Sequence, residues 1–321
     1  MSEKINADKI IRPVRVYSDW AGRKRGGGLG LQALEWEALD LGSDFFERYP
    51  LTDVQVGKAV NEKNLEGLNN HALVYDSLMR LSSSVYELRK GGFFPVIISG
   101  DHSSSAGVLA GLKQAHPDSR IGVIYIDAHA DIHSPYTSPS GNLHGMPLAM
   151  ATGLDNQECA VRKLTGEARD EWKKFKEIGT AGPKVRPEDI VFCCVRSCEE
   201  PETELLKKHG IRNFRVNEIN SKGHQETAAE IFRILEPCDL IYISFDVDSM
   251  DPSESTGTGT PEPEGLSFST AMLLNEELIR NPKVSCWEIT EINPLLDRYN
   301  RMAKLSLKIV ENTVRNLIRF Y

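Results

Sequence analysis

The sequence predicts an α/β fold with three layers (α/β/α) around a central, mainly parallel sheet. Short apolar runs recur along the chain, and amphipathic, helix-forming stretches lie between them. This alternation is typical of a parallel sheet with helices on both faces. The apolar runs are also continuous rather than alternating, as expected for strands that are buried on both faces.

The expected strands coincide with the continuous apolar runs. In chain order they are residues 14–17 (VRVY), 93–99 (FFPVIIS), 121–126 (IGVIYI), 189–195 (DIVFCCV), 239–245 (DLIYISF) and 283–289 (KVSCWEI). The expected helices occupy residues 62–90, 104–115, 201–209, 225–236, 269–280 and 300–319. Because no internal repeat or long linker interrupts this order, we expect residues 1–321 to form a single domain.

Segments rich in Gly, Ser, Thr and Pro separate several of these elements. They cover residues 22–30, 133–142 and 251–265, and we expect them to be long loops. Long loops in compact domains are often functional. Residues 154–187 form the most polar insertion, which is predicted to contain helix and turn and to cover one edge of the sheet.

Composition and charge narrow the class of protein. Of the 321 residues, 40% are hydrophobic and 26% are charged, with a net charge of −8. The acidic balance argues against nucleic acid or an anionic membrane as a partner and suits a small cationic substrate. No apolar stretch approaches the ~18 residues of a membrane-spanning helix. The start of the chain, MSEKINADKIIRPV, has no apolar signal core, so we expect a cytoplasmic protein.

The six cysteines form no paired CxxC motif. This pattern indicates neither a zinc ribbon nor a thioredoxin-like redox site. Since free cysteine is commonly buried, we expect reduced thiols that pack in the core.

Acids and imidazoles gather at the carboxyl ends of three expected strands. Their residues are Asp101 and His102 after the second strand, Asp127, His129, Asp131 and His133 after the third, and Asp246, Asp248 and Asp251 after the fifth. In an open α/β sheet, ligands bind outside the carboxyl ends of the strands. These side chains are therefore expected to meet in one crevice.

The spacing of these residues indicates a site for metal ions. In an extended segment, residues i and i+2 point the same way, so Asp127, His129 and Asp131 share a face. Adding His102 and the Asp246–Asp248 pair gives two imidazoles and four carboxylates. Two divalent cations would cancel the repulsion among the carboxylates and could supply a hydroxide. A site with oxygen and imidazole ligands and no thiolate suits Mn²⁺, with Fe²⁺, Co²⁺, Ni²⁺ or Zn²⁺ as alternatives.

Simpler interpretations exist for each residue alone. A single histidine at a strand end usually makes an ordinary hydrogen bond, and a DxD pair can cap a helix or form a turn. However, five of the eight histidines lie between residues 102 and 144, beside acid-bearing strand ends. That combination favours the metal site.

The motifs around these residues resemble the ureohydrolase family, and most closely the arginases. They are SGDHS (99–103), DAHADIH (127–133) and SFDVDSMDPS (244–253), with SGNLHGMP (140–147), TGTPEPEGLS (258–267) and EITEINP (288–294). The resemblance covers about residues 90–300 and implies an arginase-like fold. RKRGGG (23–28) resembles the Gly-rich entry loop of arginases, although alone it is a weak motif that could be a plain turn.

The resemblance assigns roles to individual residues. It implies that two Mn²⁺ ions per subunit are bound by His102, Asp127, His129, Asp131, Asp246 and Asp248. Asp131 would also protonate the leaving amine, His144 would shuttle protons, and Glu291 would pair with the substrate guanidinium. Without the resemblance, His144 could be a loop histidine and Glu291 a strand-end ion pair. The implied contacts to the rest of the substrate are His133, Ser140, Asn142, Glu199, Glu202 and Thr260.

Two of these positions depart from the arginase pattern. His133 stands where arginases usually carry the Asn that holds the substrate carboxylate, and Glu199 stands in place of an Asp that accepts the α-amino group. An imidazole differs from an amide in shape and in its donors and acceptors. The amino-acid end of the substrate is therefore less clearly implied than urea-forming hydrolysis.

The resemblance as a whole implies a hydrolase that cleaves L-arginine to L-ornithine and urea. Alternatives are agmatine, guanidinobutyrate, guanidine or formimidoylglutamate as substrate, or a non-catalytic metal-binding protein of the same fold. A deacetylase is disfavoured because those enzymes use a single-zinc pattern that SFDVDSMDP does not match. The family commonly forms trimers or hexamers, so a homo-oligomer is expected.

Overall fold

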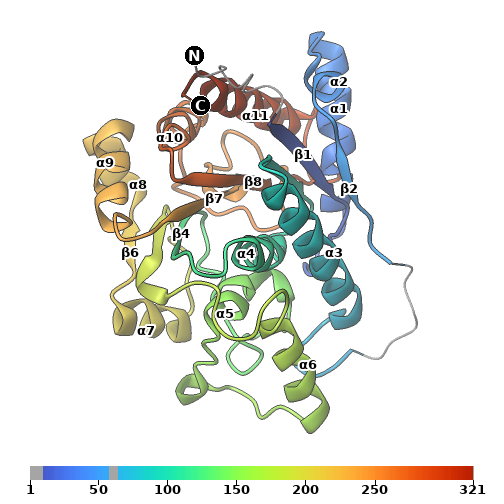
Figure 1. Ribbon diagram of the computed structural model, residues 1–321, viewed down its shortest axis with the longest axis vertical. Helices are drawn as coiled ribbons and strands as arrows, with labels where there is room; N and C mark the ends of the chain where they lie inside the picture. The colour runs from blue at the N-terminus through green and yellow to red at the C-terminus, as the bar shows by residue number, and fades with distance from the viewer. Residues whose placement is uncertain (1–9, 58–63, 321) are drawn as a thin grey trace.

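The structure, a computed structural model, describes residues 10–57 and 64–320. Its centre is an eight-stranded sheet with the order β2-β1-β3-β8-β7-β4-β5-β6, and all described strand pairs are parallel (Figure 1). The strands are β1 (Ile11–Val16), β2 (Thr52–Val54), β3 (Phe94–Ser99), β4 (Ile121–Ile126), β5 (Ile190–Cys193), β6 (Arg212–Phe214), β7 (Leu240–Asp246) and β8 (Val284–Thr290).

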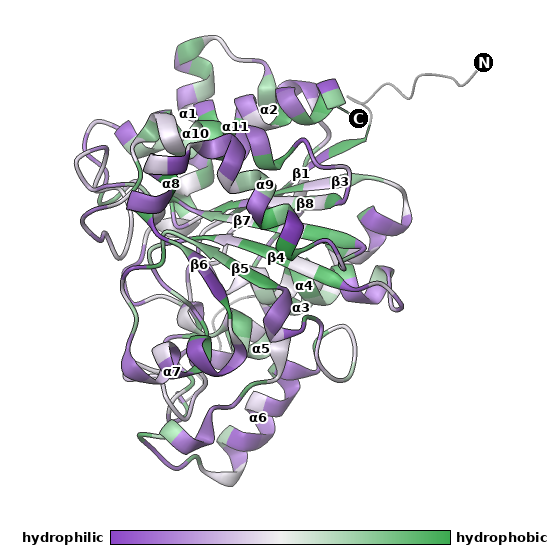
Figure 2. Ribbon diagram, turned by 90° about the vertical axis from the view of Figure 1, so that its left-hand side faces the viewer, coloured by the Kyte–Doolittle hydropathy of each residue, from purple (hydrophilic) through white to green (hydrophobic). Residues whose placement is uncertain are grey.

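Helices cover both faces of this sheet, which confirms the three-layer α/β/α prediction (Figure 2). One layer contains α1 (Gly30–Leu41), α2 (Phe45–Arg48), α8 (Val216–Lys222), α9 (His224–Ile234), α10 (Phe268–Leu278) and α11 (Arg301–Phe320). The other contains α3 (His71–Lys90), α4 (Ser104–Ala115), α5 (Pro147–Thr152) and α7 (Glu200–His209), with α6 (Gly166–Lys176) packed on its outside.

The central strands are apolar at every position because each face packs against a helical layer. In β4, Ile124 and Ile126 join the core beneath α10 and α11, whereas Val123 and Tyr125 join the core beneath α3 and α4. A strand with only one covered face would alternate between apolar and polar residues.

The predicted strands were found, and two short ones were missed. β2 and β6 lie at the two edges of the sheet and have three residues each, most of them not fully buried. Such segments lack the continuous apolar run that marks a central strand. β1 also begins before the predicted residue 14. It can include Pro13, which has no N–H to donate, because at this residue the strand pairs only with β3 and not with β2.

The predicted helices correspond to α3, α4, α7, α9, α10 and α11. Of the expected 62–90 helix, residues 62–63 lie outside the described part of the chain, as do residues 1–9 of the N-terminal stretch, and α3 begins at His71. The expected loop at 22–30 in fact ends in a short 3-10 helix, η2 (Gly27–Leu29), and the first residue of α1.

The polar insertion at 154–187 does not cover a sheet edge, contrary to the prediction. Its helix α6 packs on the outside of the α3–α5 layer, where Trp172 and Phe175 join a small apolar cluster with Leu78 of α3 and Ala110 of α4. The apolar face of α6 is therefore buried against other helices and not against the sheet.

All six cysteines are unpaired, and four of them are buried, as predicted for packing thiols. Among the described residues, no helix combines the length and apolar character needed to cross a bilayer.

Candidate metal centre

The sheet order brings the predicted site together. β3, β8, β7 and β4 are consecutive neighbours, so the loops after their carboxyl ends meet at one edge. His102 follows β3, Asp127 follows β4, Asp246 ends β7, and Glu291 follows β8. This is the position at which open α/β sheets bind ligands.

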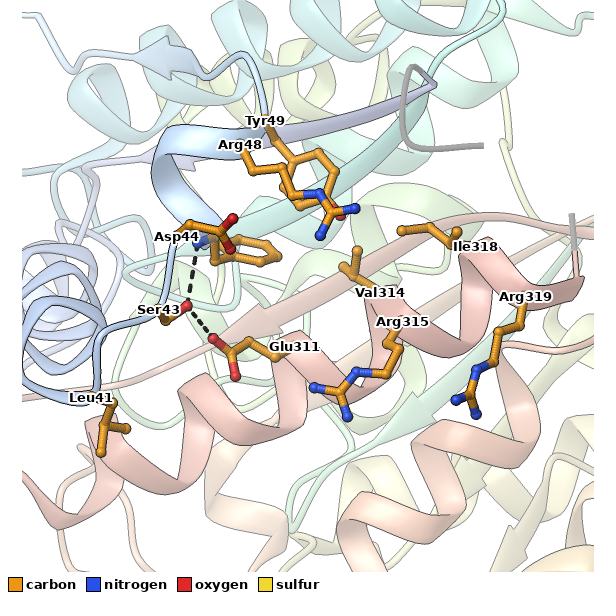
Figure 3. A pocket seen from close by; sticks show the side chains of 11 residues that line it. Leu41, Ser43, Asp44, Arg48, Tyr49, Glu311, Val314, Arg315, Ile318 and Arg319 are labelled. Atoms are coloured by element: carbon orange, nitrogen blue, oxygen red, sulfur yellow. Dashed lines mark hydrogen bonds between the residues drawn. The ribbon is translucent and has the colours of Figure 1, made fainter. Parts of the chain in front are cut away.

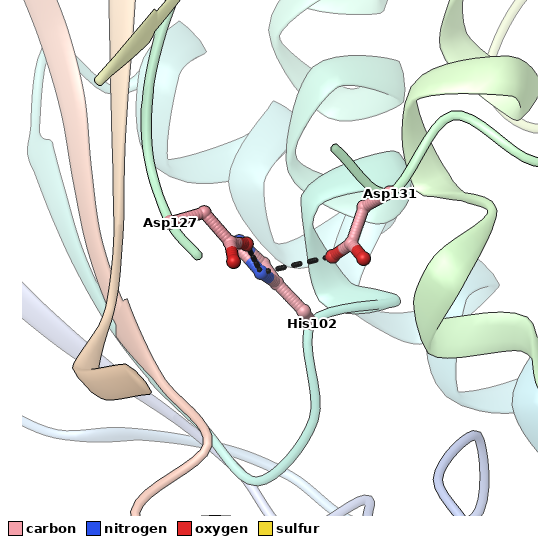
Figure 4. Close-up of side chains that lie close together, drawn as sticks. All are labelled: His102, Asp127 and Asp131. Atoms are coloured by element: carbon pink, nitrogen blue, oxygen red, sulfur yellow. Dashed lines mark ion pairs between the residues drawn. The ribbon is translucent and has the colours of Figure 1, made fainter. Parts of the chain in front are cut away.

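His102 is the centre of the first group of candidate metal ligands (Figure 4). Its Nδ1 lies 2.8 Å from Asp127 Oδ2, 3.1 Å from Asp246 Oδ2 and 3.2 Å from Asp131 Oδ2. The ring stacks on Tyr125 with centroids 4.3 Å apart, and its Nε2 lies 2.7 Å from Ser244 Oγ. These contacts hold Nδ1 toward the carboxylates.

His129 forms the second group from the other side. Its Nδ1 lies 3.0 Å from Asp248 Oδ2 and 3.5 Å from Asp127 Oδ1, so Asp127 belongs to both groups. The other ring nitrogen, Nε2, faces Glu262 Oε1 at 3.7 Å. An outer carboxylate of this kind orients a ligating imidazole.

The donors fit two divalent cations. In two sets, His102–Asp127–Asp131 and Asp127–His129–Asp248, the candidate ligand atoms all lie within 4.8 Å of one another, and the donors are imidazole nitrogens and carboxylate oxygens. His102 Nδ1 and Asp127 Oδ2 are buried and close together, yet neither has a hydrogen-bond partner of acceptable geometry. Unsatisfied buried polar atoms that converge in this way are what bound cations would compensate.

The electrostatics of the cluster lead to the same conclusion. Burial, and next the charge of Asp248, raise the pKa of Asp246 well above its usual range. Burial alone would lower the pKa of His102, but its contacts with Asp127, Asp131 and Asp246 raise it well above normal. Both shifts reflect the surplus of negative charge at this position, which bound cations would offset.

Two site residues adopt a left-handed backbone conformation. Asp131 and Glu291 have φ angles of 49° and 64°. Non-glycine residues rarely adopt such angles, and they do so mostly where the surrounding structure requires a particular side-chain direction. Asp131 and Glu291 both point into the same cavity.

Glu291 and His144 form a pair beside the metal ligands. Glu291 Oε1 accepts a hydrogen bond from the His102 backbone N–H at 3.1 Å and lies 3.1 Å from His144 Nδ1. Burial alone lowers the pKa of His144, but the contact with Glu291 outweighs it and raises the pKa to about 9. Burial, and next the charge of Glu291, raise the pKa of nearby Asp101 to about 6.

One cavity of about 130 Å³ connects these groups with the expected substrate contacts. Every predicted site residue except Asp127, which is buried beneath the cavity, lines it. Its walls are His102, His129, Asp131, His133, Ser138, Pro139, Ser140, Asn142, His144, Gly145, Glu199, Glu202, Asp246, Asp248, Thr260 and Glu291.

Two neighbouring acids lie outside the metal groups. Asp251, which the strand-end pattern included, accepts backbone N–H groups from Ser253 and Gly265 instead. Asp101 accepts hydrogen bonds from Ser18 and Ser103 and so ties the β3 loop to the β1 loop.

Sequence reasoning missed several residues that support the site. Arg196 donates to five backbone carbonyls around the site, those of Cys194, Asp248, Ser249, Glu262 and Pro263. Glu288 is fully buried in β8 and accepts hydrogen bonds from serines of β3 and α4. An Arg directly after a strand, and a Glu inside an apolar strand, were the only signals in the sequence.

A larger hollow of about 440 Å³ lies between α1–α2 and α11 (Figure 3). Its walls include Arg48, Arg315 and Arg319, and Ser43 is hydrogen-bonded to Glu311 across it. None of the described residues that line it is a histidine or cysteine, and none belongs to a metal-ligand group. The chemistry therefore lies in the smaller, acid-lined cavity.

Comparison with known proteins agrees with this geometry. A family model described as "Arginase family" matches residues 23–315. The arginase of Bacillus subtilis (strain 168) is 32% identical over 312 residues, which cover 95% of this chain and 97% of that protein. The structure of Bacillus caldovelox arginase has a TM-score of 0.80 at 30% identity, and covers 95% of this chain and 98% of its own. Entamoeba histolytica arginase, solved in complex with L-ornithine, has a TM-score of 0.82 at 26% identity, covering 95% of this chain and 98% of its own.

Proposed function

The chain belongs to the arginase family, and on that premise we propose that it hydrolyses L-arginine to L-ornithine and urea. It is a hydrolase of the ureohydrolase type. The observation that carries the proposed reaction is the pair of metal-ligand groups that share Asp127, with Glu291 on the wall of the same cavity.

The proposed ligands are His102, Asp127, His129, Asp131, Asp246 and Asp248 for two Mn²⁺ ions, with Co²⁺, Ni²⁺, Fe²⁺ or Zn²⁺ as alternatives. When bound, a pair of such cations supplies positive charge and a hydroxide nucleophile near neutral pH. The absence of a thiolate from the donor set and the number of carboxylates support a hard, oxygen-preferring metal.

Glu291 would hold the guanidinium group. Its carboxylate is on the cavity wall, and its contacts with His144 and the His102 backbone fix its direction. Thr260 would line the same end, since its hydroxyl donates to Asp248 Oδ2 at 3.1 Å. A fixed cation presents its central carbon in one orientation, which removes much of the entropic cost of attack.

Asp131 and His144 would handle the protons. Asp131 Oδ2 accepts a hydrogen bond from the Tyr125 hydroxyl at 3.0 Å. Its second oxygen would take the proton that the attacking water loses and pass it to the leaving amine. The His144 side chain is 21% exposed and contacts Glu291, which supports its exchange of protons with solvent. Ser140, Asn142 and Glu199 would receive the remainder of the substrate, and His133 and Glu202 line the same cavity.

The proposal also covers the location, the metabolic role and the oligomeric state of the enzyme. We propose a cytoplasmic protein that acts in arginine metabolism on small cationic guanidino compounds and forms a homo-oligomer, a trimer or hexamer, as the family does. Size-exclusion chromatography with light scattering would measure that number, and a monomer that retains full activity would contradict the oligomer.

A substrate panel tests the proposed reaction. Protein loaded with Mn²⁺ is expected to release urea from L-arginine, measured by a colorimetric urea assay. Agmatine, 4-guanidinobutanoate and guanidine are the comparison substrates. Urea release from one of these but not from L-arginine would show that this compound, and not L-arginine, is the substrate. No urea release from any of the four compounds would overturn the enzyme assignment.

A further inference from the structure

The ring of His133 is already bonded on both sides. Its Nδ1 lies 3.0 Å from Thr137 Oγ1, and its Nε2 lies 3.0 Å from Glu199 Oε2. Thr137 is itself held in place, because its hydroxyl oxygen accepts the Ser134 backbone N–H at 3.1 Å. An imidazole has only two polar atoms, so His133 has none left for a ligand in the cavity.

Glu199 is the accessible carboxylate at this end of the cavity. Its side chain is 56% exposed, whereas that of Glu202 is 4% exposed. The two oxygens of Glu202 accept the backbone N–H groups of Ile132 and Glu199. The bond from Glu199 belongs to the capping box that begins α7, in which the Glu199 side chain in turn accepts the Glu202 backbone N–H. Both carboxylates are thus held by the backbone, but only that of Glu199 is exposed enough for a ligand to reach.

The charge of the cavity favours a cation at both ends. Glu291 lies on the wall beside His102, and Glu199 lies on the wall beside His133. No lysine or arginine is among the described residues that line the cavity. A hydrogen bond from His133 lowers the pKa of Glu199 to about 2, so this carboxylate is charged at neutral pH. A substrate carboxylate would meet only hydroxyl and amide donors there, beside a negative charge.

We propose that His133 is a positioning residue that Thr137 anchors and that holds Glu199 in place to receive an ammonium group. The enzyme would then select guanidino substrates by their amine rather than by their carboxylate. This inference rests on the proposed guanidino hydrolysis. It adds that the enzyme recognises the amine at the end of the substrate opposite the guanidinium group.

Three substrates separate the two groups. L-arginine has both the amine and the carboxylate, agmatine has only the amine, and 4-guanidinobutanoate has only the carboxylate. For the Mn²⁺-loaded enzyme, we expect kcat/KM for agmatine within about 10-fold of that for L-arginine, and about 100-fold above that for 4-guanidinobutanoate. A higher kcat/KM for 4-guanidinobutanoate than for agmatine would overturn the inference.

Variants at Thr137 test the positioning role without changing the cavity wall. Thr137→Val keeps the shape but removes the hydroxyl, and is expected to raise KM for L-arginine and agmatine about 5-fold, as for one lost hydrogen bond, with kcat nearly constant. Thr137→Ser retains the hydroxyl and should restore KM. A merely structural role would instead lower kcat for all three substrates alike, and Thr137→Ser would not separate from Thr137→Val.

Glu199→Gln provides the direct comparison. It is expected to reduce the agmatine to 4-guanidinobutanoate ratio of kcat/KM by about 10-fold or more. An unchanged ratio would refute the assignment of Glu199. If no guanidino compound is hydrolysed at all, the proposed reaction fails, and calorimetric binding of agmatine and 4-guanidinobutanoate still decides the inference, since tighter binding of 4-guanidinobutanoate would exclude it.

Discussion

At the residue scale, Asp127 and Asp248 show how the two metal-ligand groups divide. Asp127 contacts both histidines, whereas Asp248 contacts only His129 and receives the Thr260 hydroxyl. Changes at the two positions should therefore differ in how many metals they remove.

Asp248→Ala is expected to reduce the bound metal from two ions per subunit toward one and to lower kcat at least about 100-fold. Elemental analysis of the purified protein measures the first effect and a urea assay the second. Asp239→Asn is a matched control, because Asp239 lies beside the opposite end of β7 and accepts the Arg120 backbone N–H. A variant with one metal and full activity would contradict the two-metal proposal.

His144 should make stability depend on pH in the metal-free protein. Its contact with Glu291 raises its pKa to about 9 against the effect of burial, so the folded state binds the proton more tightly than the unfolded state. The stabilising contribution is therefore complete below the unfolded pKa of about 6.5 and is lost as pH rises through about 9.

The measurement compares the free energy of unfolding in urea for the wild type and His144→Asn between pH 6 and pH 10. The difference between the two proteins should shrink as pH rises. A difference that stays constant or grows with pH would show that Glu291 does not stabilise the protonated His144.

At the element scale, the loop at 251–265 depends on Arg196. The guanidinium group donates to the carbonyl of Asp248 at 2.9 Å and to those of Glu262 and Pro263 at 2.8 Å. It thus joins the segment after β5 to the end of β7 and to the loop that contains Thr260. A planar fork makes these bonds at fixed angles that an ammonium group cannot reproduce.

Arg196→Lys is expected to weaken Mn²⁺ binding about 10-fold and to lower the melting temperature, although the charge is kept. Calorimetric titration and thermal unfolding measure the two effects. Arg186→Lys, at an exposed arginine beside η5 (Pro187–Asp189), provides the control. Equal metal affinity in the wild type and Arg196→Lys would mean that the loop keeps its position without the guanidinium group.

The predicted helices and strands were accurate where the burial of an element is visible as a run of apolar residues in its own sequence. The residues of α4 coincide with the predicted 104–115, because nearly all of the helix is buried and residues 106–112 form a continuous run of small and apolar residues. The short edge strands and the placement of α6 could not be predicted in this way, because they depend on contacts with segments far away in the sequence.

At the scale of the whole molecule, bound cations would join three loops of the sheet. The candidate ligands follow β3, β4 and β7, and β7 is separated from β4 in the sequence by two other strands, β5 and β6. A ligand that binds only the folded state stabilises that state by mass action. The metals should therefore contribute to folding as well as to catalysis.

Removal of metal with a chelator is expected to lower the melting temperature, and Mn²⁺ should restore it. At a free metal concentration of 100 times the Kd, each ion would add about 2.7 kcal/mol. Differential scanning calorimetry with and without the chelator measures the change. Identical melting temperatures would indicate that no ion binds the folded protein under those conditions.

The sequence by itself determined the three-layer fold and the metal-ligand candidates. Both depend on patterns that are local in the sequence. Continuous apolar runs indicate strands buried on both faces, and acids and histidines directly after such strands lie at the edge where parallel sheets bind ligands. Asp127, His129 and Asp131 were therefore identifiable together, as were Asp246 and Asp248.

Only the tertiary structure decided which distant residues support these ligands. The contacts between His144 and Glu291, between Arg196 and the 251–265 loop, and between His133 and Glu199 join segments separated by 147, 66 to 67 and 66 positions. The local pattern does not record such contacts, because the order in which the strands pair, not their own composition, brings their loops together.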